Sequence, residues 1–249
     1  AGGLGHPPKM SVPVGAVGLS NQFFFLLNLT LFGTNSGASV FAAQYWGADD
    51  RSNLRRVLGL CLAICLTVAA AFAITALAFP TWVMRLYTAD PAVISLGSVY
   101  LRTIGWSYLF FAISTSFAAI LRSTGNVRLP MVVSSIGILL NIVFGYLLIF
   151  GKMGMPSLGA QGAAYANLIA RVVECAVMVG MTYYLKTPLA VSPRQMFSFN
   201  TSFLSKILKR VLPVTVNELM WSLGISAYSA IYAHISTEAI AAINIRSSI

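Results

Sequence analysis

The sequence is poor in charged residues, above all in acidic ones. Asp, Glu, Lys and Arg make up 9% of the 249 residues, and only 6 residues are acidic. Soluble globular chains carry about a quarter charged residues, so this composition excludes an ordinary soluble domain. Because 57% of residues are apolar and the mean hydropathy is +0.80, we expect an all-α, polytopic integral membrane protein.

Cysteine and histidine are also scarce, with three and two residues respectively. Cys61 and Cys65 lie one turn apart in an apolar run with no nearby His or acid. Since a zinc site needs about four clustered ligands, we expect these thiols to be packing residues and predict no metal site. No nucleophile motif, phosphate-binding loop or HExxH motif occurs, so no enzyme activity is expected.

The formal charge of +10 does not indicate nucleic-acid binding. The basic residues are spread between apolar blocks and form no basic stripe with interleaved aromatic residues.

Several apolar runs are long enough to cross a membrane, since a transmembrane helix needs about 20 mainly apolar residues. Complete runs of this kind cover residues 15–45, 57–79, 92–121, 129–150, 158–185 and 211–235. A further run begins near Ala239.

The basic residues between the runs predict the orientation, because positive loops face the cytoplasm. Loops on the side of the 186–210 connector hold ten Lys and Arg residues, and the opposite loops hold only Lys9, Arg85 and Lys152. We therefore expect residues 186–210 to form a cytoplasmic linker at the plasma membrane, with a short interfacial helix at 202–210. Arg102, at the edge of a run, is expected to extend toward the lipid headgroups.

A weak internal repeat bears on the domain organisation. Residues 14–22, VGAVGLSNQ, resemble residues 240–248, IAAINIRSS. A repeat of six spans places two bundles in the same orientation, with substrate between them. The predicted division is an irregular N-terminal remnant at 1–13, a first lobe at 14–185, the linker at 186–210 and the start of a second lobe at 211–249.

Five ordered stretches of the sequence resemble the multidrug and toxic compound extrusion (MATE) transporters. They are AQYWGADD, RSTGNVRLPM, LLNIVFGYLLIFG, LGAQGAAYANLIARVVE and LPVTVNELMWSLG. The resemblance implies a bundle of two six-helix lobes, of which this chain covers spans two to seven and the start of span eight. The first lobe then lacks its first span, and the source is expected to be bacterial.

Glu218 is an acid within an apolar run, about a third of the way into 212–235. A charge at membrane depth is tolerated mainly where it faces a cavity, a partner or water. The resemblance implies that Glu218 binds a cation or substrate in the second lobe. The alternative is a structural pair with a neighbouring helix.

The resemblance also points to two amides in the first lobe. Asn141 matches an Asn of the family's cation site, although Gly145 stands where some relatives carry an acid. Asn167 falls where relatives often carry a hydroxyl residue and would line the same cavity. Either amide could instead form a hydrogen bond between helices, worth about 1 kcal/mol.

The function that the resemblance implies is export of small organic, cationic or amphipathic solutes. Export would be coupled to inward flow of sodium ions or protons, with membrane lipid as the surroundings and no other cofactor. Two alternatives stay open. One is a lipid-linked saccharide flippase of a related fold, and the other is a truncated chain that transports nothing.

Overall fold

The computed structural model describes residues 11–154, 156–198 and 200–235, and all regular structure in these residues is helical. The expected repeat copy at 240–248 and the run near Ala239 lie outside the described residues. The helices are α1 (Ser11–Gly47), α2 (Arg51–Ala78), α3 (Pro80–Tyr87), α4 (Pro91–Gly105), α5 (Ser107–Ser123), α6 (Arg128–Phe150), α7 (Ala160–Tyr184), α8 (Pro193–Met196) and α9 (Thr201–Ile235).

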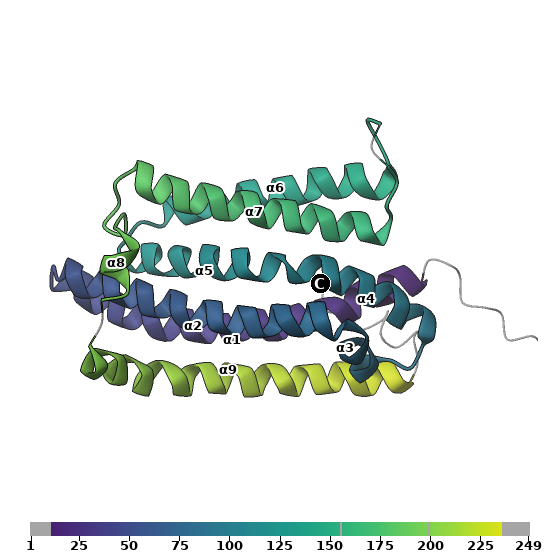
Figure 1. Ribbon diagram of the computed structural model, residues 1–249, viewed down its shortest axis with the longest axis horizontal. Helices are drawn as coiled ribbons and strands as arrows, with labels where there is room; N and C mark the ends of the chain where they lie inside the picture. The colour runs from purple at the N-terminus through teal and green to yellow at the C-terminus, as the bar shows by residue number, and fades with distance from the viewer. Residues whose placement is uncertain (1–10, 155, 199, 236–249) are drawn as a thin grey trace, which may run out of the picture.

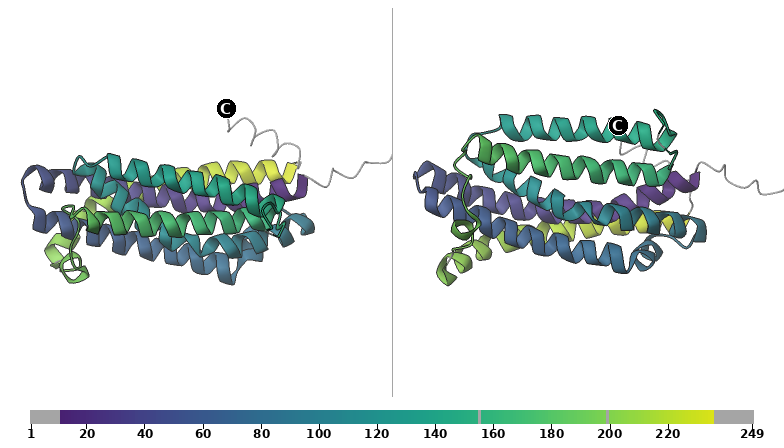
Figure 2. Two further views of the ribbon diagram at one scale, coloured as in Figure 1. Left: turned by 90° about the horizontal axis from the view of Figure 1, so that it is seen from above. Right: turned by 45° about the horizontal axis from the view of Figure 1, so that its top comes forward.

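The long helices lie roughly side by side in one bundle (Figure 1). Helices α6 and α7 form one edge, α9 forms the opposite edge, and α1, α2 and α5 lie between them. Figure 2 shows the same packing from two further directions. The loop between α6 and α7 is at the same end of the bundle as α3, whereas α8 is at the other end.

Four helices are long and apolar enough to cross a membrane, namely α1, α2, α6 and α7, and the bent pair α4–α5 makes a fifth candidate. Helix α6 exposes several apolar side chains, since Ile138, Leu139 and Ile142 are all more than 60% exposed. An exposed apolar face of this kind suits hydrocarbon better than water. These helices agree with the expected all-α membrane fold.

The run expected as one span at 92–121 is two helices that bend by 47° around Trp106. Gly105 permits close packing at this bend, because a Cβ at that position would lie 3.1 Å from Cβ of Ala76. The short helix α3 was not expected, since eight residues are too few for a span. Both differences lie at the end of the bundle where α2 ends.

Helix α9 differs from the expected break between an interfacial helix at 202–210 and a span from 211. It is continuous from Thr201, and Pro213 lies inside the helix rather than at its boundary. Asn217 and Glu218 interrupt its apolar sequence, and α9 is not among the helices apolar enough to be candidate spans. Its place in the bundle therefore follows from its packing against α1 rather than from its hydropathy.

Candidate cation and substrate sites

The contact between α1 and α9 is built on two small residues. A Cβ added to Gly33 would lie 2.9 Å from Cγ of Glu218 and 3.0 Å from Cα of Thr215, and one added to Gly37 would lie 3.1 Å from Cα of Val211. Glycines four residues apart lie on one face of a helix and let a neighbouring backbone approach closely. The GxxxG face of α1 is therefore the surface on which α9 rests.

A polar contact accompanies this close packing. The hydroxyl groups of Thr34 and Thr215 lie 3.1 Å apart, and both residues are buried. Thr215 is one turn before Glu218 and on the same face of α9. The Glu218 side chain is thus held against α1 by residues on both sides of the contact.

Glu218 is partly buried, and its carboxylate makes no hydrogen bond or ion pair with any residue that the structure describes. The sequence left open that Glu218 forms a structural pair with a neighbouring helix. In residues 11–154, 156–198 and 200–235 its carboxylate has no ionic or hydrogen-bonding partner of this kind. A partly buried carboxylate without a partner retains its capacity to accept a proton or attract a cation.

Glu174 contrasts with Glu218, because it is buried and both of its carboxylate oxygens accept hydrogen bonds. Its Oε2 accepts from Nη1 of Arg171 at 2.7 Å, and its Oε1 accepts from the Ser134 hydroxyl at 3.3 Å. The guanidinium of Arg171 also lies 4.7 Å from the ring centroid of Phe111. This network joins α5, α6 and α7 and is structural.

Asn141 and Asn167 lie on α6 and α7, which pack against one another along much of their length. Both amides are partly buried, and neither makes a hydrogen bond with the described residues. Figure 1 places α9, which carries Glu218, at the opposite edge of the bundle. The structure therefore pairs the two helices that carry the amides and separates both from Glu218.

A large cavity lies between α1, α6, α7 and α9. Its volume is about 880 Å³. Most of its wall is apolar, and Asn21 and Gln22 provide the polar groups. Oε1 of Gln22 is buried and has no hydrogen-bond partner among the described residues. Its lining is Pro13, Val14, Val17, Gly18, Asn21, Gln22, Phe25, Ile149, Gly159, Ala160, Ala163 and Ile225.

None of the three residues singled out from the sequence lines this cavity, but Asn167 lies near it. Asn167 is four residues after Ala163, so both lie on the same face of α7, one turn apart. Asn21 and Gln22 were not predicted to line a cavity, because an amide near the start of an apolar run is not distinctive in the sequence. Only the space that neighbouring helices leave beside them identifies these residues.

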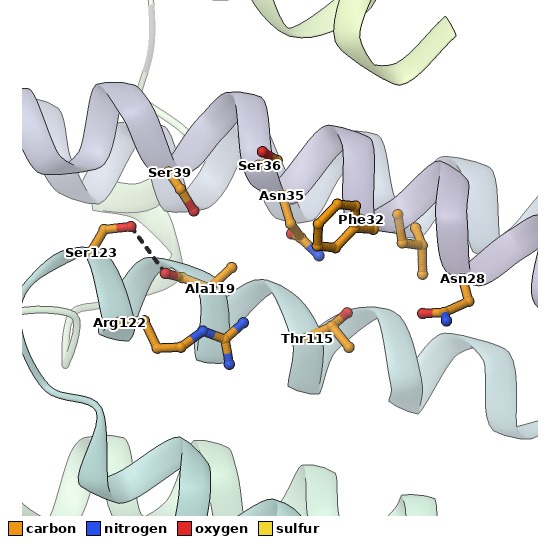
Figure 3. Close-up of a pocket in the computed structure, with 10 residues that line it drawn as sticks. Asn28, Phe32, Asn35, Ser36, Ser39, Thr115, Ala119, Arg122 and Ser123 are labelled. Carbon is orange, nitrogen blue, oxygen red and sulfur yellow. Dashed lines mark hydrogen bonds between the residues drawn. The ribbon is translucent and has the colours of Figure 1, made fainter. Parts of the chain in front are cut away.

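A second cavity, of about 440 Å³, separates α1 from α5 and is more polar (Figure 3). Asn28 and Asn35 of α1 point toward Thr115 and Arg122 of α5. Asn35 is buried, and its Oδ1 accepts a hydrogen bond from the Cys61 thiol at 3.1 Å. The helical spacing of polar residues on both helices was the signal available in the sequence.

Comparisons with known proteins agree with this architecture. The MatE family model matches residues 8–147. A probable multidrug resistance protein, YoeA of Bacillus subtilis, is 27% identical over 92% of this chain and 50% of its own length. A probable multidrug resistance protein, NorM of Thermotoga maritima, is 28% identical over 90% of this chain and 48% of its own length. The chain thus spans about half the length of these relatives.

Solved structures show the same fold. An inward-facing multidrug resistance MATE family transporter of the MOP superfamily superposes with a TM-score of 0.78 at 24% identity. It covers 92% of this chain, which in turn covers 51% of it. The family match confirms the resemblance read from the motifs, and with it the expected membrane-transporter class rather than an enzyme. The chain belongs to the MATE family and has the helical fold of its transporters over about half of their length.

Proposed function

We propose that this chain is part of a cation-coupled antiporter that exports small organic cations. Sodium ions or protons flow inward as the substrate leaves, by alternating access between two lobes. The observation that carries the proposal is the partly buried Glu218, which has no ionic partner among the described residues. Family membership and the names of the bacterial relatives support export of drug-like compounds.

Glu218 has the chemistry that exchange requires. A proton, a sodium ion and an organic cation can each neutralise the same carboxylate, so binding of one disfavours the others. At 4 Å and an effective dielectric of 20, a cation and a carboxylate attract by about 4 kcal/mol, of which desolvation offsets a large part. Competition at this carboxylate would couple ion entry to substrate release.

The large cavity between α1, α6, α7 and α9 supports a substrate that is mainly apolar. Its volume of about 880 Å³ falls in the range of about 300–1,000 Å³ typical of small-molecule sites. In this proposal the unpaired amide of Gln22 binds a polar group of the substrate, and Asn167 lies one turn beyond the cavity wall. Asn141 serves as a separate cation ligand of the first lobe.

The proposal also includes the arrangement of the chain in the membrane. Residues 14–185 belong to the first lobe, 186–210 form a cytoplasmic linker, and 211–249 begin the second lobe. The excess of Lys and Arg on the linker side supports this orientation in the plasma membrane. Function through alternating access requires that ligands bind the two states with different affinity.

The test measures binding and export with Glu218→Gln. The purified chain in nanodiscs is titrated with tetraphenylphosphonium at several pH values and sodium concentrations. We expect binding that competes with protons or sodium, and an affinity at least tenfold lower in Glu218→Gln because the charge is lost. Asp49→Asn is the matched control, since it removes a carboxylate that is exposed in a loop and paired only with Arg51.

Export is measured in parallel as energy-dependent efflux of a fluorescent organic cation at equal membrane abundance. Loss of efflux in Glu218→Gln alone would support the antiporter, and equal efflux in both proteins would refute a role for Glu218. Binding of a lipid-linked sugar in place of the cation would favour the flippase. A folded chain that binds neither compound would favour the non-transporting alternative.

A further inference from the structure

A third cavity lies between α3 and α4 at the end of the bundle opposite α8, and its chemistry differs from that of the other two. Its volume is about 570 Å³. Arg85 of α3 and Arg102 of α4 both line it, together with the hydroxyl residues Thr81, Ser95 and Ser98. No carboxylate is among the residues that line this cavity.

The two guanidinium groups have no anionic partner in the part of the chain that the structure describes. The ion pairs there are Arg51–Asp49 and Arg171–Glu174, and the side chains of Arg85 and Arg102 make no hydrogen bond with a described residue. The hydroxyl oxygen of Ser98 is buried and lacks a partner among the same residues. The cavity therefore offers two positive charges and an unused polar group to a ligand.

Two exposed Trp residues near the cavity bear on its depth in the membrane. Gly105, three residues after Arg102, packs against Ala76 in the last turn of α2. Trp82 on α3 and Trp106 at the bend are 59% and 58% exposed. Trp is enriched at the level of the lipid headgroups, and Arg85 and Arg102 each lie one turn from one of these Trp residues. The proposal therefore places both guanidinium groups near the depth of lipid phosphates.

We propose that this cavity binds the phosphate group of an anionic membrane lipid. Arg recognises phosphate through charge and paired N–H donors. Pro91, Ile94 and Val99 form an apolar side to the cavity, which suits the glycerol and upper acyl carbons beside a headgroup. A soluble anion would use the guanidinium groups but would leave this apolar wall without a partner.

The site is independent of solute export and is tested by lipid binding. The purified, delipidated chain is titrated with phosphatidylglycerol in detergent, and native mass spectrometry counts retained lipids. We expect Arg85→Ala and Arg102→Ala each to weaken the first binding event about tenfold, because each removes a charge-assisted contact. The double variant should lose that event, and the two Arg→Lys variants should bind more tightly than the Ala variants but less tightly than wild type, because Lys keeps the charge without the paired donors.

Lys152→Ala is the matched control, because Lys152 is an exposed cation in the loop at the same end of the bundle. It should bind phosphatidylglycerol as the wild type does, and circular dichroism confirms the helical content of every variant. Equal lipid retention by the double variant would overturn the proposal. Displacement of the first lipid by about 10 mM inorganic phosphate would reassign the site to a soluble anion, since lipid contacts beyond phosphate should resist it.

Discussion

Substitution of Gly33 by Ala tests the contact between α1 and α9 directly. The new Cβ would lie 2.9 Å from Cγ of Glu218 and 3.0 Å from Cα of Thr215. The Glu218 side chain can rotate away, but the Thr215 backbone cannot, so the two helices must separate. Overpacking of this kind costs about 1–3 kcal/mol, whereas replacing Gly by Ala within a helix contributes about 1 kcal/mol of stability.

The net effect of Gly33→Ala is therefore a loss of up to about 2 kcal/mol. Gly180 provides the matched control, because it is exposed in α7 and a Cβ there meets nothing within 4 Å. Gly180→Ala should gain about 0.5–1 kcal/mol from helix propensity alone. The two substitutions make the same chemical change with opposite expected signs.

Thermal unfolding in detergent, followed by size-exclusion chromatography, measures both variants. At about 2–4 °C per kcal/mol for a chain of this size, Gly33→Ala should melt several degrees below wild type and Gly180→Ala slightly above it. Adding Glu218→Ala to Gly33→Ala should recover part of the loss, because Cγ of Glu218 is one of the crowded atoms. If Gly33→Ala gains as much stability as Gly180→Ala, α9 does not rest on this face of α1.

Two further stability predictions concern charged side chains. Arg171→Met should cost about 2–3 kcal/mol of unfolding free energy, because it leaves the buried carboxylate of Glu174 without its cation. Denaturant unfolding should show that the double variant Arg171→Met with Glu174→Leu recovers part of this stability. Asp50→Ala should cost about 1 kcal/mol, because Asp50 caps α2 by accepting from the backbone N–H of Asn53. That hydrogen bond lowers the pKa of Asp50, so its stabilisation is complete above the ordinary Asp pKa and is lost as pH falls through the lowered one. Unfolding measured against pH should show this loss in wild type and not in Asp50→Asn.

The sequence was sufficient to predict the long helices, because each is an apolar run longer than a bilayer requires. It was insufficient for the bend at Trp106, since residues 92–121 contain no proline and only packing against α2 shows where the helix turns. Pro213 indicated a boundary, yet α9 passes through it. A proline removes one helical hydrogen bond, and long helices tolerate that loss where neighbours support them.

Some of the candidate sites could likewise be predicted from the sequence, and others could not. Glu218 was recognisable from the sequence because an acid is rare in an apolar run, and the resemblance pointed to Asn141 and Asn167. The cavity beside Gln22 and the cavity between Arg85 and Arg102 could not be predicted, because each depends on helices distant in sequence leaving space between them. Arg102 was expected to extend toward the headgroups, but only the packing of α3 beside α4 brings Arg85 to the same cavity.

The two acids within the long helices show why burial alone does not identify a transport residue. Glu174 is the more buried, but Arg171 and Ser134 already satisfy its oxygens, so taking up an external cation would require breaking those contacts. Glu218 is less buried and has no such contacts to lose among the described residues. A cation that binds at Glu218 competes only with water and protons. Its binding therefore costs less free energy than binding at Glu174, where existing contacts must be broken. An acid that exchanges its counter-ion must be free of permanent partners, and of these two only Glu218 has none among the described residues.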